Sequence, residues 1–284
     1  MTERSRFVVS PDWLESHLGD PNLRIVDASW YLPAQNRDAT AEYLQSHIPG
    51  SVFFDQDRIA EPGSDLPHTL PSPDVFARFA GALGLSDTNT IVVYDGPGMF
   101  TAPRVWWMLR IMGAGDVFLL DGGFDNWKRE GRPTDDASPV VMPAQFETRF
   151  DGSAVASLEM MLSIIDRGDV QIADARSPGR FEGTEPEPRD GMRSGHMPGA
   201  FNLPVISLSE NGYLKDLVTL RSLFVEAGID PARPVVTTCG SGVTAAVITL
   251  ALESLGYSDN MLYDGSWSQW GSLPDTPVET GKRQ

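Results

Sequence analysis

Residues 234–244 read PVVTTCGSGVT, and residues 245–255, which follow directly, read AAVITLALESL. The apolar start of this stretch is typical of a buried strand, its glycine-rich middle of a tight loop, and the second run of a buried helix. Gly256 stands at the end of the second run, where glycine often terminates a helix. The stretch therefore predicts strand, loop and helix in succession, the repeating element of an α/β fold with a parallel sheet.

The same pattern occurs in the first half of the chain. Residues 90–95 (TIVVYD) resemble residues 234–239 (PVVTTC). Three further matches follow the same order in both halves: RIVDA at 24–28 with QIADA at 171–175, HIPGS at 47–51 with HMPGA at 196–200, and Asp121-Gly122…Trp127 with Asp264-Gly265…Trp270. A repeat of about 130 residues is too long for a solenoid and indicates two tandem domains.

The expected fold class is α/β, with two tandem domains that each hold a mainly parallel sheet flanked by helices on both faces. Apolar periodicity predicts helices over residues 74–83 and 217–227. Residues 132–157 are rich in Pro, Asp, Ser and Ala and break the pattern. We therefore place the first domain at 1–138, a linker at 139–156 and the second domain at 157–284.

The composition limits the possible functions. The formal net charge of −17 disfavours binding to nucleic acid or to anionic membranes. No run approaches the roughly 18 apolar residues that span a bilayer, and residues 1–12 lack the apolar core of a secretory signal. The single cysteine and four scattered histidines argue against disulfides and metal sites. We expect a cytoplasmic protein with no metal and no cofactor.

Cys239 is the candidate nucleophile. It stands at the carboxyl end of the predicted strand, where ligands bind in open α/β sheets. Gly240 and Gly242 allow a curled loop whose backbone N–H groups converge, and the next helix adds partial positive charge. Such a place stabilises a thiolate or a persulfide anion. A buried structural cysteine is the alternative interpretation.

The first half carries Asp95 where the second carries Cys239, in the loop at residues 95–101 (DGPGMFT). An aspartate cannot form a persulfide. We therefore expect the first domain to be catalytically silent and to form one wall of a site between the domains.

The loop, the duplication and the repeated segments resemble the tandem rhodanese-like sulfurtransferases. The CGSGVT loop, Trp30-Tyr31 and the run at 179–189 (GRFEGTEPEPR) resemble the branch of that family that uses 3-mercaptopyruvate. There the loop cysteine takes sulfur from the donor, releases pyruvate and passes the sulfur to a thiol or cyanide. The resemblance implies that Cys239 is catalytic and that its loop, Gly240, Gly242, Val243 and Thr244 included, contacts substrate.

The resemblance also assigns Arg180 and Arg189 to substrate binding. Arginine forms paired, directional hydrogen bonds with a carboxylate, which suits a 2-oxo acid. Two solvated arginines in an acidic loop are the alternative.

A third set, Asp57, His68 and Ser241, matches the serine-protease-like triad of the mercaptopyruvate enzymes. Such a relay could polarise the substrate carbonyl or supply a proton to the pyruvate carbon. It requires the two domains to face each other. Otherwise His68 is only a loop histidine and Ser241 a small polar residue.

Other functions remain open at this point. Thiosulfate:cyanide sulfurtransferase is the runner-up, although thiosulfate-using rhodaneses typically carry Arg and Lys where this loop has Gly240 and Ser241. A cysteine phosphatase needs an arginine six positions after the cysteine, and that position is Ala245. A noncatalytic rhodanese-like binding module is a remote alternative.

The count of cysteines also predicts the partners. With Cys239 alone, no second thiol of the chain can resolve a persulfide. We expect a small-molecule sulfur donor and an external acceptor, such as thioredoxin, a small thiol or cyanide.

Overall fold

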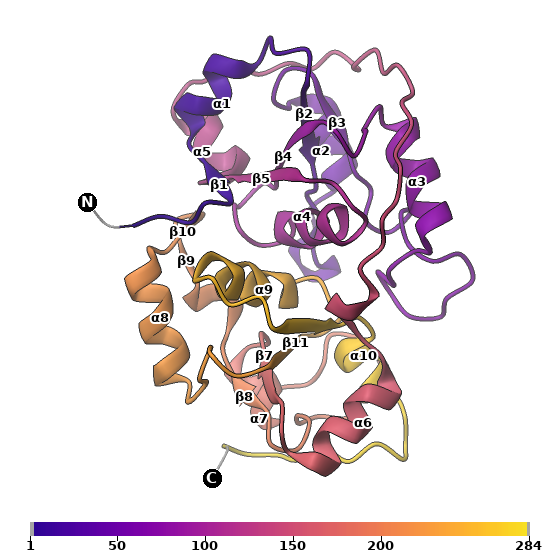
Figure 1. The fold of residues 1–284 in the computed structure, drawn as a ribbon, viewed down its shortest axis with the longest axis vertical. Helices are drawn as coiled ribbons and strands as arrows, with labels where there is room; N and C mark the ends of the chain where they lie inside the picture. The colour runs from indigo at the N-terminus through magenta and orange to yellow at the C-terminus, as the bar shows by residue number, and fades with distance from the viewer. Residues whose placement is uncertain (1–2, 283–284) are drawn as a thin grey trace.

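Two five-stranded parallel sheets, one in each half of the chain, organise the computed structural model, which describes residues 3–282 (Figure 1). In sheet order, the first contains β1 (Val8–Val9), β5 (Asp116–Leu120), β4 (Thr90–Tyr94), β2 (Leu23–Asp27) and β3 (Ser51–Phe53). The second contains β6 (Val155–Ala156), β12 (Asn260–Tyr263), β11 (Val235–Thr238), β7 (Gln171–Asp174) and β8 (Phe201–Asn202). The two orders are equivalent, which confirms the duplicated α/β fold.

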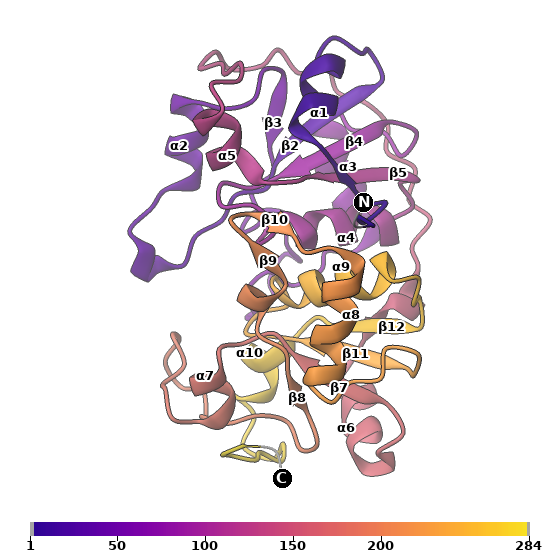
Figure 2. The same cartoon turned by 90° about the vertical axis from the view of Figure 1, so that its left-hand side faces the viewer.

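Helices flank both sheets (Figures 1 and 2). The first domain contains α1 (Pro11–His17), α2 (Ala39–Gln45), α3 (Pro73–Ala82), α4 (Ala102–Ile111) and α5 (Gly123–Arg129). The second contains α6 (Leu158–Arg167), α7 (Pro178–Glu182), α8 (Leu217–Glu226), α9 (Ala245–Ser254) and α10 (Ser266–Trp270). Helices α3, α8 and α9 agree with the predicted helices within one residue at each end.

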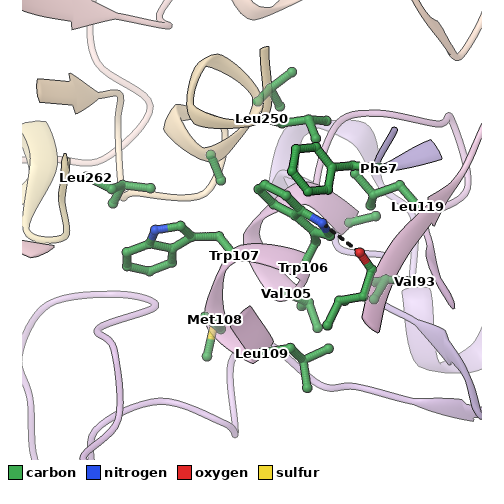
Figure 3. Close-up of a cluster of buried hydrophobic side chains, with 14 of the residues drawn as sticks. Phe7, Val93, Val105, Trp106, Trp107, Met108, Leu109, Leu119, Leu250 and Leu262 are labelled. Atoms are coloured by element: carbon green, nitrogen blue, oxygen red, sulfur yellow. Dashed lines mark hydrogen bonds between the residues drawn. The ribbon is translucent and has the colours of Figure 1, made fainter. Parts of the chain in front are cut away.

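A single apolar core joins the two domains. Helices α4 and α9, which follow the matching loops of the two halves, pack against each other between the sheets. Trp106 and Trp107 of α4 lie in this core with Leu250 of α9 and Leu262 of β12 (Figure 3). The Trp106 Nε1 group donates to the carbonyl of Val117 at 3.1 Å, so its one polar atom is satisfied. This packing sets how the domains face each other.

The segment at 139–156, expected as a linker, packs on the first domain before it enters the second. The Ala144 N–H donates to the Gly81 carbonyl at 2.9 Å, and Phe146 is buried. The last two residues, Val155–Ala156, form β6 and pair with β12. The composition of this segment did not predict these contacts.

Two loops cross from one domain to the other. One joins β3 to α3, and its Leu70 N–H donates to Asp264 Oδ2 of the second domain at 2.8 Å. The other joins β8 to α8 and holds a hairpin of β9 (Ser209–Glu210) and β10 (Tyr213–Leu214), seen in Figure 2. Its Leu214 N–H donates to Asp121 Oδ1 of the first domain at 2.9 Å. Each domain thus lends a loop to the carboxyl edge of the other sheet.

Candidate active site

Cys239 directly follows β11, one of the inner strands of the second sheet, and is only 2% exposed. Gly242 curls the loop with a φ of +76°, and a Cβ there would lie 2.8 Å from the Asp264 carbonyl oxygen. The start of α10 anchors the cysteine, since its backbone N–H donates to Ser266 Oγ at 3.2 Å and its carbonyl accepts from Trp267 at 3.0 Å. The backbone that carries the thiol is therefore tied to α10 by two hydrogen bonds.

A cavity of about 200 Å³ opens over Cys239. Trp30, Leu32 and Phe100 of the first domain line it together with residues of the second domain. The predicted site residues that line it are Cys239, Gly240, Ser241, Val243, Thr244, Arg180 and Arg189. Gly242 is not among them, because its backbone faces Asp264 and Arg104 instead. The cavity lies between domains, where binding sites are common.

Two of the three arginines in the cavity are neutralised by buried carboxylates. Arg176 forms ion pairs with Asp174 at 2.6 Å and with Glu187 at 2.7 Å. Arg180 binds the other oxygen of Glu187, whose side chain is 1% exposed. Glu187 therefore fixes the position of Arg180 while cancelling its charge.

Arg189 is the uncompensated cation of the cavity. Within residues 3–282 its side chain makes no hydrogen bond or ion pair, although several charged groups act on it through space. Burial, and next the Arg180 cation, lower the pKa of the Arg189 guanidinium. Because a guanidinium in a protein stays charged, Arg189 is the one arginine among the described residues of this cavity that is free to pair with a substrate carboxylate.

Asp57, His68 and Ser241 form a continuous hydrogen-bonded chain across the domain boundary. His68 Nδ1 lies 3.0 Å from Ser241 Oγ, and His68 Nε2 lies 2.9 Å from Asp57 Oδ1. Trp30 Nε1 donates to both Asp57 oxygens, at 3.1 and 3.0 Å, and its ring meets His68 edge to face. The hydrogen bond with His68 lowers the pKa of Asp57, which keeps this carboxylate ionised.

The matching loop of the first domain is filled by its own Asp95. The Asp95 carboxylate is fully buried and accepts hydrogen bonds from the backbone N–H groups of Gly98, Phe100, Thr101 and Ala102, at 2.6 to 2.9 Å. The N–H groups of this loop thus converge on an anion, as expected for the loop of Cys239, but here the anion is the carboxylate of Asp95 itself. Gly212 of the β9–β10 hairpin packs over this loop, which supports a silent first domain.

Sequence reasoning missed Glu187, Arg104 and Asp264 as parts of this region. Glu187 lies within the run at 179–189, where only its two arginines were singled out. Arg104 had a usable signal, because it is a charged residue in the mainly apolar run at 102–109, and such residues are buried only with a partner. Within residues 3–282, no cluster of His, Cys, Asp and Glu could hold a metal ion.

Comparisons with known proteins identify the relatives of this chain. The rhodanese-like domain family matches residues 10–130 and 157–273. The 3-mercaptopyruvate sulfurtransferase of Rattus norvegicus is 43% identical, over 98% of this chain and 96% of the rat protein. The thiosulfate sulfurtransferase of Cricetulus griseus is 41% identical over the same shares. The crystal structure of SseA from Escherichia coli, described as a 3-mercaptopyruvate sulfotransferase, gives a TM-score of 0.84 at 39% identity, over 92% of this chain and 98% of that one.

Proposed function

The chain belongs to the rhodanese-like family, as a sulfurtransferase of the 3-mercaptopyruvate type, and on this premise we propose that Cys239 carries the transferred sulfur as a persulfide. One observation carries the proposal. A single cavity brings together three side chains: Cys239, the uncompensated Arg189, and Ser241, whose hydroxyl is linked by hydrogen bonds through His68 to Asp57.

The charge of the cavity supports mercaptopyruvate as the donor. Its single carboxylate is matched by Arg189, with Arg180 beside it as a second directional donor. Thiosulfate is a dianion and would need a second uncompensated cation, but the loop offers neutral Gly240 and Ser241. Overall identity does not separate the two donors, because the rat and Cricetulus griseus proteins are similarly close to this chain.

The first half-reaction forms a sulfur–sulfur bond. The Cys239 thiolate attacks the donor's sulfur, and the carbon–sulfur bond breaks, leaving its electron pair on the carbon as the enolate of pyruvate. The outer sulfur keeps its proton, so Cys239 becomes a persulfide. Ser241 donates a proton to the enolate carbon, and pyruvate leaves.

Protonated His68 then gives a proton back to Ser241. Asp57 stabilises the His68 imidazolium before this transfer. The depressed pKa of Asp57 supports this role, since an ionised carboxylate is the form that stabilises a cation.

The second half-reaction delivers the sulfur to an external acceptor. Sulfurtransferase activity implies a donor and an acceptor, and the single cysteine leaves no internal thiol to take the sulfur. The acceptor thiolate attacks the outer persulfide sulfur and releases the Cys239 thiolate. We propose thioredoxin, a small thiol or cyanide as acceptors.

We also propose a cytoplasmic location, supported by the composition and the lone cysteine. No helix within residues 3–282 is both long and apolar enough to cross a membrane.

Pyruvate release from 3-mercaptopyruvate, compared with turnover of thiosulfate, tests the proposed donor. We expect the larger kcat/KM with mercaptopyruvate and no turnover by Cys239→Ser. A larger kcat/KM with thiosulfate would favour the runner-up activity. Absence of any persulfide with either donor would favour the noncatalytic binding module.

A further inference from the structure

Arg104 and Asp264 form a buried ion pair between the domains. Arg104 lies on α4 of the first domain and is 1% exposed, and Asp264 follows β12 of the second. Arg104 Nη2 donates to Asp264 Oδ1 at 2.5 Å. Because removing two charges from water offsets much of their attraction, such a pair is weak evidence for stability alone. Its position suggests a different role.

The pair holds the backbone that directly follows the His68 side chain. Arg104 Nη2 also donates to the His68 carbonyl at 2.8 Å, and Asp264 Oδ2 accepts from the Leu70 N–H at 2.8 Å. His68 has a φ of +57°, a left-handed conformation that is uncommon for residues other than glycine. Such a conformation persists only where surrounding contacts enforce it.

Arg104 also reaches the cysteine loop. Its Nη1 donates to the Gly242 carbonyl at 3.4 Å, a long contact, and Gly242 directly follows Ser241. One guanidinium therefore contacts the backbone of His68 and that of Gly242, the residue after Ser241. Its guanidinium carbon lies over the Trp107 ring, 4.7 Å from the ring centroid, which limits its movement.

The duplicated half lacks this arrangement. Asp121 holds the Leu214 N–H as Asp264 holds that of Leu70, but its ion-pair partner is Arg4 from the N-terminal segment. Counted from the matching positions Asp95 and Cys239, the counterpart of Arg104 in α9 is Ile248. An arginine at this place thus occurs only on the side that serves the Cys239 loop.

We propose that Arg104 and Asp264 are positioning residues that hold His68 against Ser241 for proton transfer. The inference rests on the proposed function, because the two residues would set the geometry of the proposed proton relay from His68 to Ser241. Neither side chain lines the cavity over Cys239, so neither touches substrate.

Arg104→Met tests the proposal, with Arg110→Met as the matched control. Arg110 lies on the same helix and pairs with Glu253 of α9 across the same interface, at 2.8 Å, without touching the His68 connection. We expect Arg104→Met to lower kcat for pyruvate release by about tenfold or more, with KM within about twofold. Arg110→Met should retain both values, and Arg104→Lys should recover part of kcat.

Combination with His68→Ala separates positioning from general damage. If Arg104 acts through His68, the double variant should be no slower than His68→Ala alone. Losses that multiply, or an unchanged kcat in folded Arg104→Met, overturn the proposal. If Arg104→Met fails to fold, the double variant Arg104→Met, Asp264→Asn takes its place in the same comparison, because it removes both buried charges.

A failure of the relay itself is distinguishable from a failure of this inference. If His68→Ala retains full kcat, the proposed relay is absent, and NMR of the histidine rings decides about positioning. His68 signals, assigned by their loss in His68→Ala, should shift in Arg104→Met and stay unchanged in Arg110→Met. Unchanged His68 signals in Arg104→Met overturn the positioning role.

Discussion

His68 Nδ1 lies 3.0 Å from Ser241 Oγ, although the two residues are 173 positions apart and belong to different domains. The contact exists because the connection between β3 and α3 crosses the interface and is tied to Asp264. A proton path between the domains therefore depends on how two separate sheets are packed.

Ser241→Ala should break this path. We expect kcat for pyruvate release to fall by about a hundredfold, the lower range for a positioned acid or base, while KM changes little. Ser272→Ala is the control, because Ser272 is exposed and bonds only to the nearby Gln269 carbonyl. A normal kcat in Ser241→Ala would remove the serine from the mechanism.

Cys239→Ser should abolish sulfur transfer and leave the fold intact, because a hydroxyl is a poor sulfur nucleophile at neutral pH. Intact-protein mass spectrometry after incubation with mercaptopyruvate alone should find the wild-type chain heavier by one sulfur atom. Added thiol should remove that mass. Normal pyruvate release with no sulfur-bearing protein, even by rapid quench, would mean direct transfer between substrates.

Arg189→Lys and Arg180→Lys should each lower kcat/KM for mercaptopyruvate by about tenfold or more, since a charge-assisted hydrogen bond contributes about 1.5–3 kcal/mol. Lysine keeps the charge but loses the fork geometry. Arg167→Lys is the control, because Arg167 is exposed and pairs with Asp169 on the surface. If all three variants keep the wild-type kcat/KM, Arg180 and Arg189 are ordinary solvated charges with no role in substrate binding.

Gly240→Ala should disturb the position of Arg180. An added Cβ would lie 2.9 Å from Arg180 Nη2, and the guanidinium must move because it is the flexible partner. Since Glu187 holds that guanidinium, we expect KM to rise severalfold without loss of fold. Gly115→Ala, where a Cβ meets nothing within 4 Å, should leave KM unchanged. An unaltered KM in Gly240→Ala would show that Arg180 does not need its present position.

Asp27→Asn should stabilise the protein near pH 7. Burial raises the pKa of Asp27 from 3.8 to about 6, whereas its counterpart Asp174 is paired with Arg176. Between these two pH values the folded state binds the proton more strongly, so the carboxyl's contribution to stability falls as pH rises through this window. Asparagine does not titrate, and the two-unit shift corresponds to at most about 3 kcal/mol.

Chemical unfolding of wild type and Asp27→Asn, at about pH 4 and pH 7, measures this effect. The difference in unfolding free energy should grow in favour of the variant as pH rises. Asp174→Asn should instead destabilise, because it leaves Arg176 with one carboxylate fewer. A pH-independent difference for Asp27→Asn would mean that folding does not raise the pKa of Asp27.

Local patterns in the sequence were enough to predict the fold. Apolar runs and glycines located β11, the Cys239 loop and α9, because each depends on neighbours close in the chain. The resemblance to known sulfurtransferases supplied the two arginines and the triad, and it was confirmed at the level of family and activity. The roles of individual site residues stay predictions.

The pairing of Arg104 with Asp264 between the domains could not be predicted. Arg104 and Asp264 are 160 positions apart, and their pairing depends on the packing of α4 against α9. Glu187 was overlooked for a related reason. Its charge matters only through two arginines that the folded chain brings to its two oxygens.

The filled loop around Asp95 has a consequence for the history of the two halves. Replacement of Asp95 by cysteine would remove the carboxylate that now accepts hydrogen bonds from the N–H groups of Gly98, Thr101 and Ala102. Gly212 of the second domain would still pack against Pro97 and Gly98 of this loop. A second reactive centre in the first domain would need coordinated changes in both domains. The specialisation of the two copies is therefore hard to reverse.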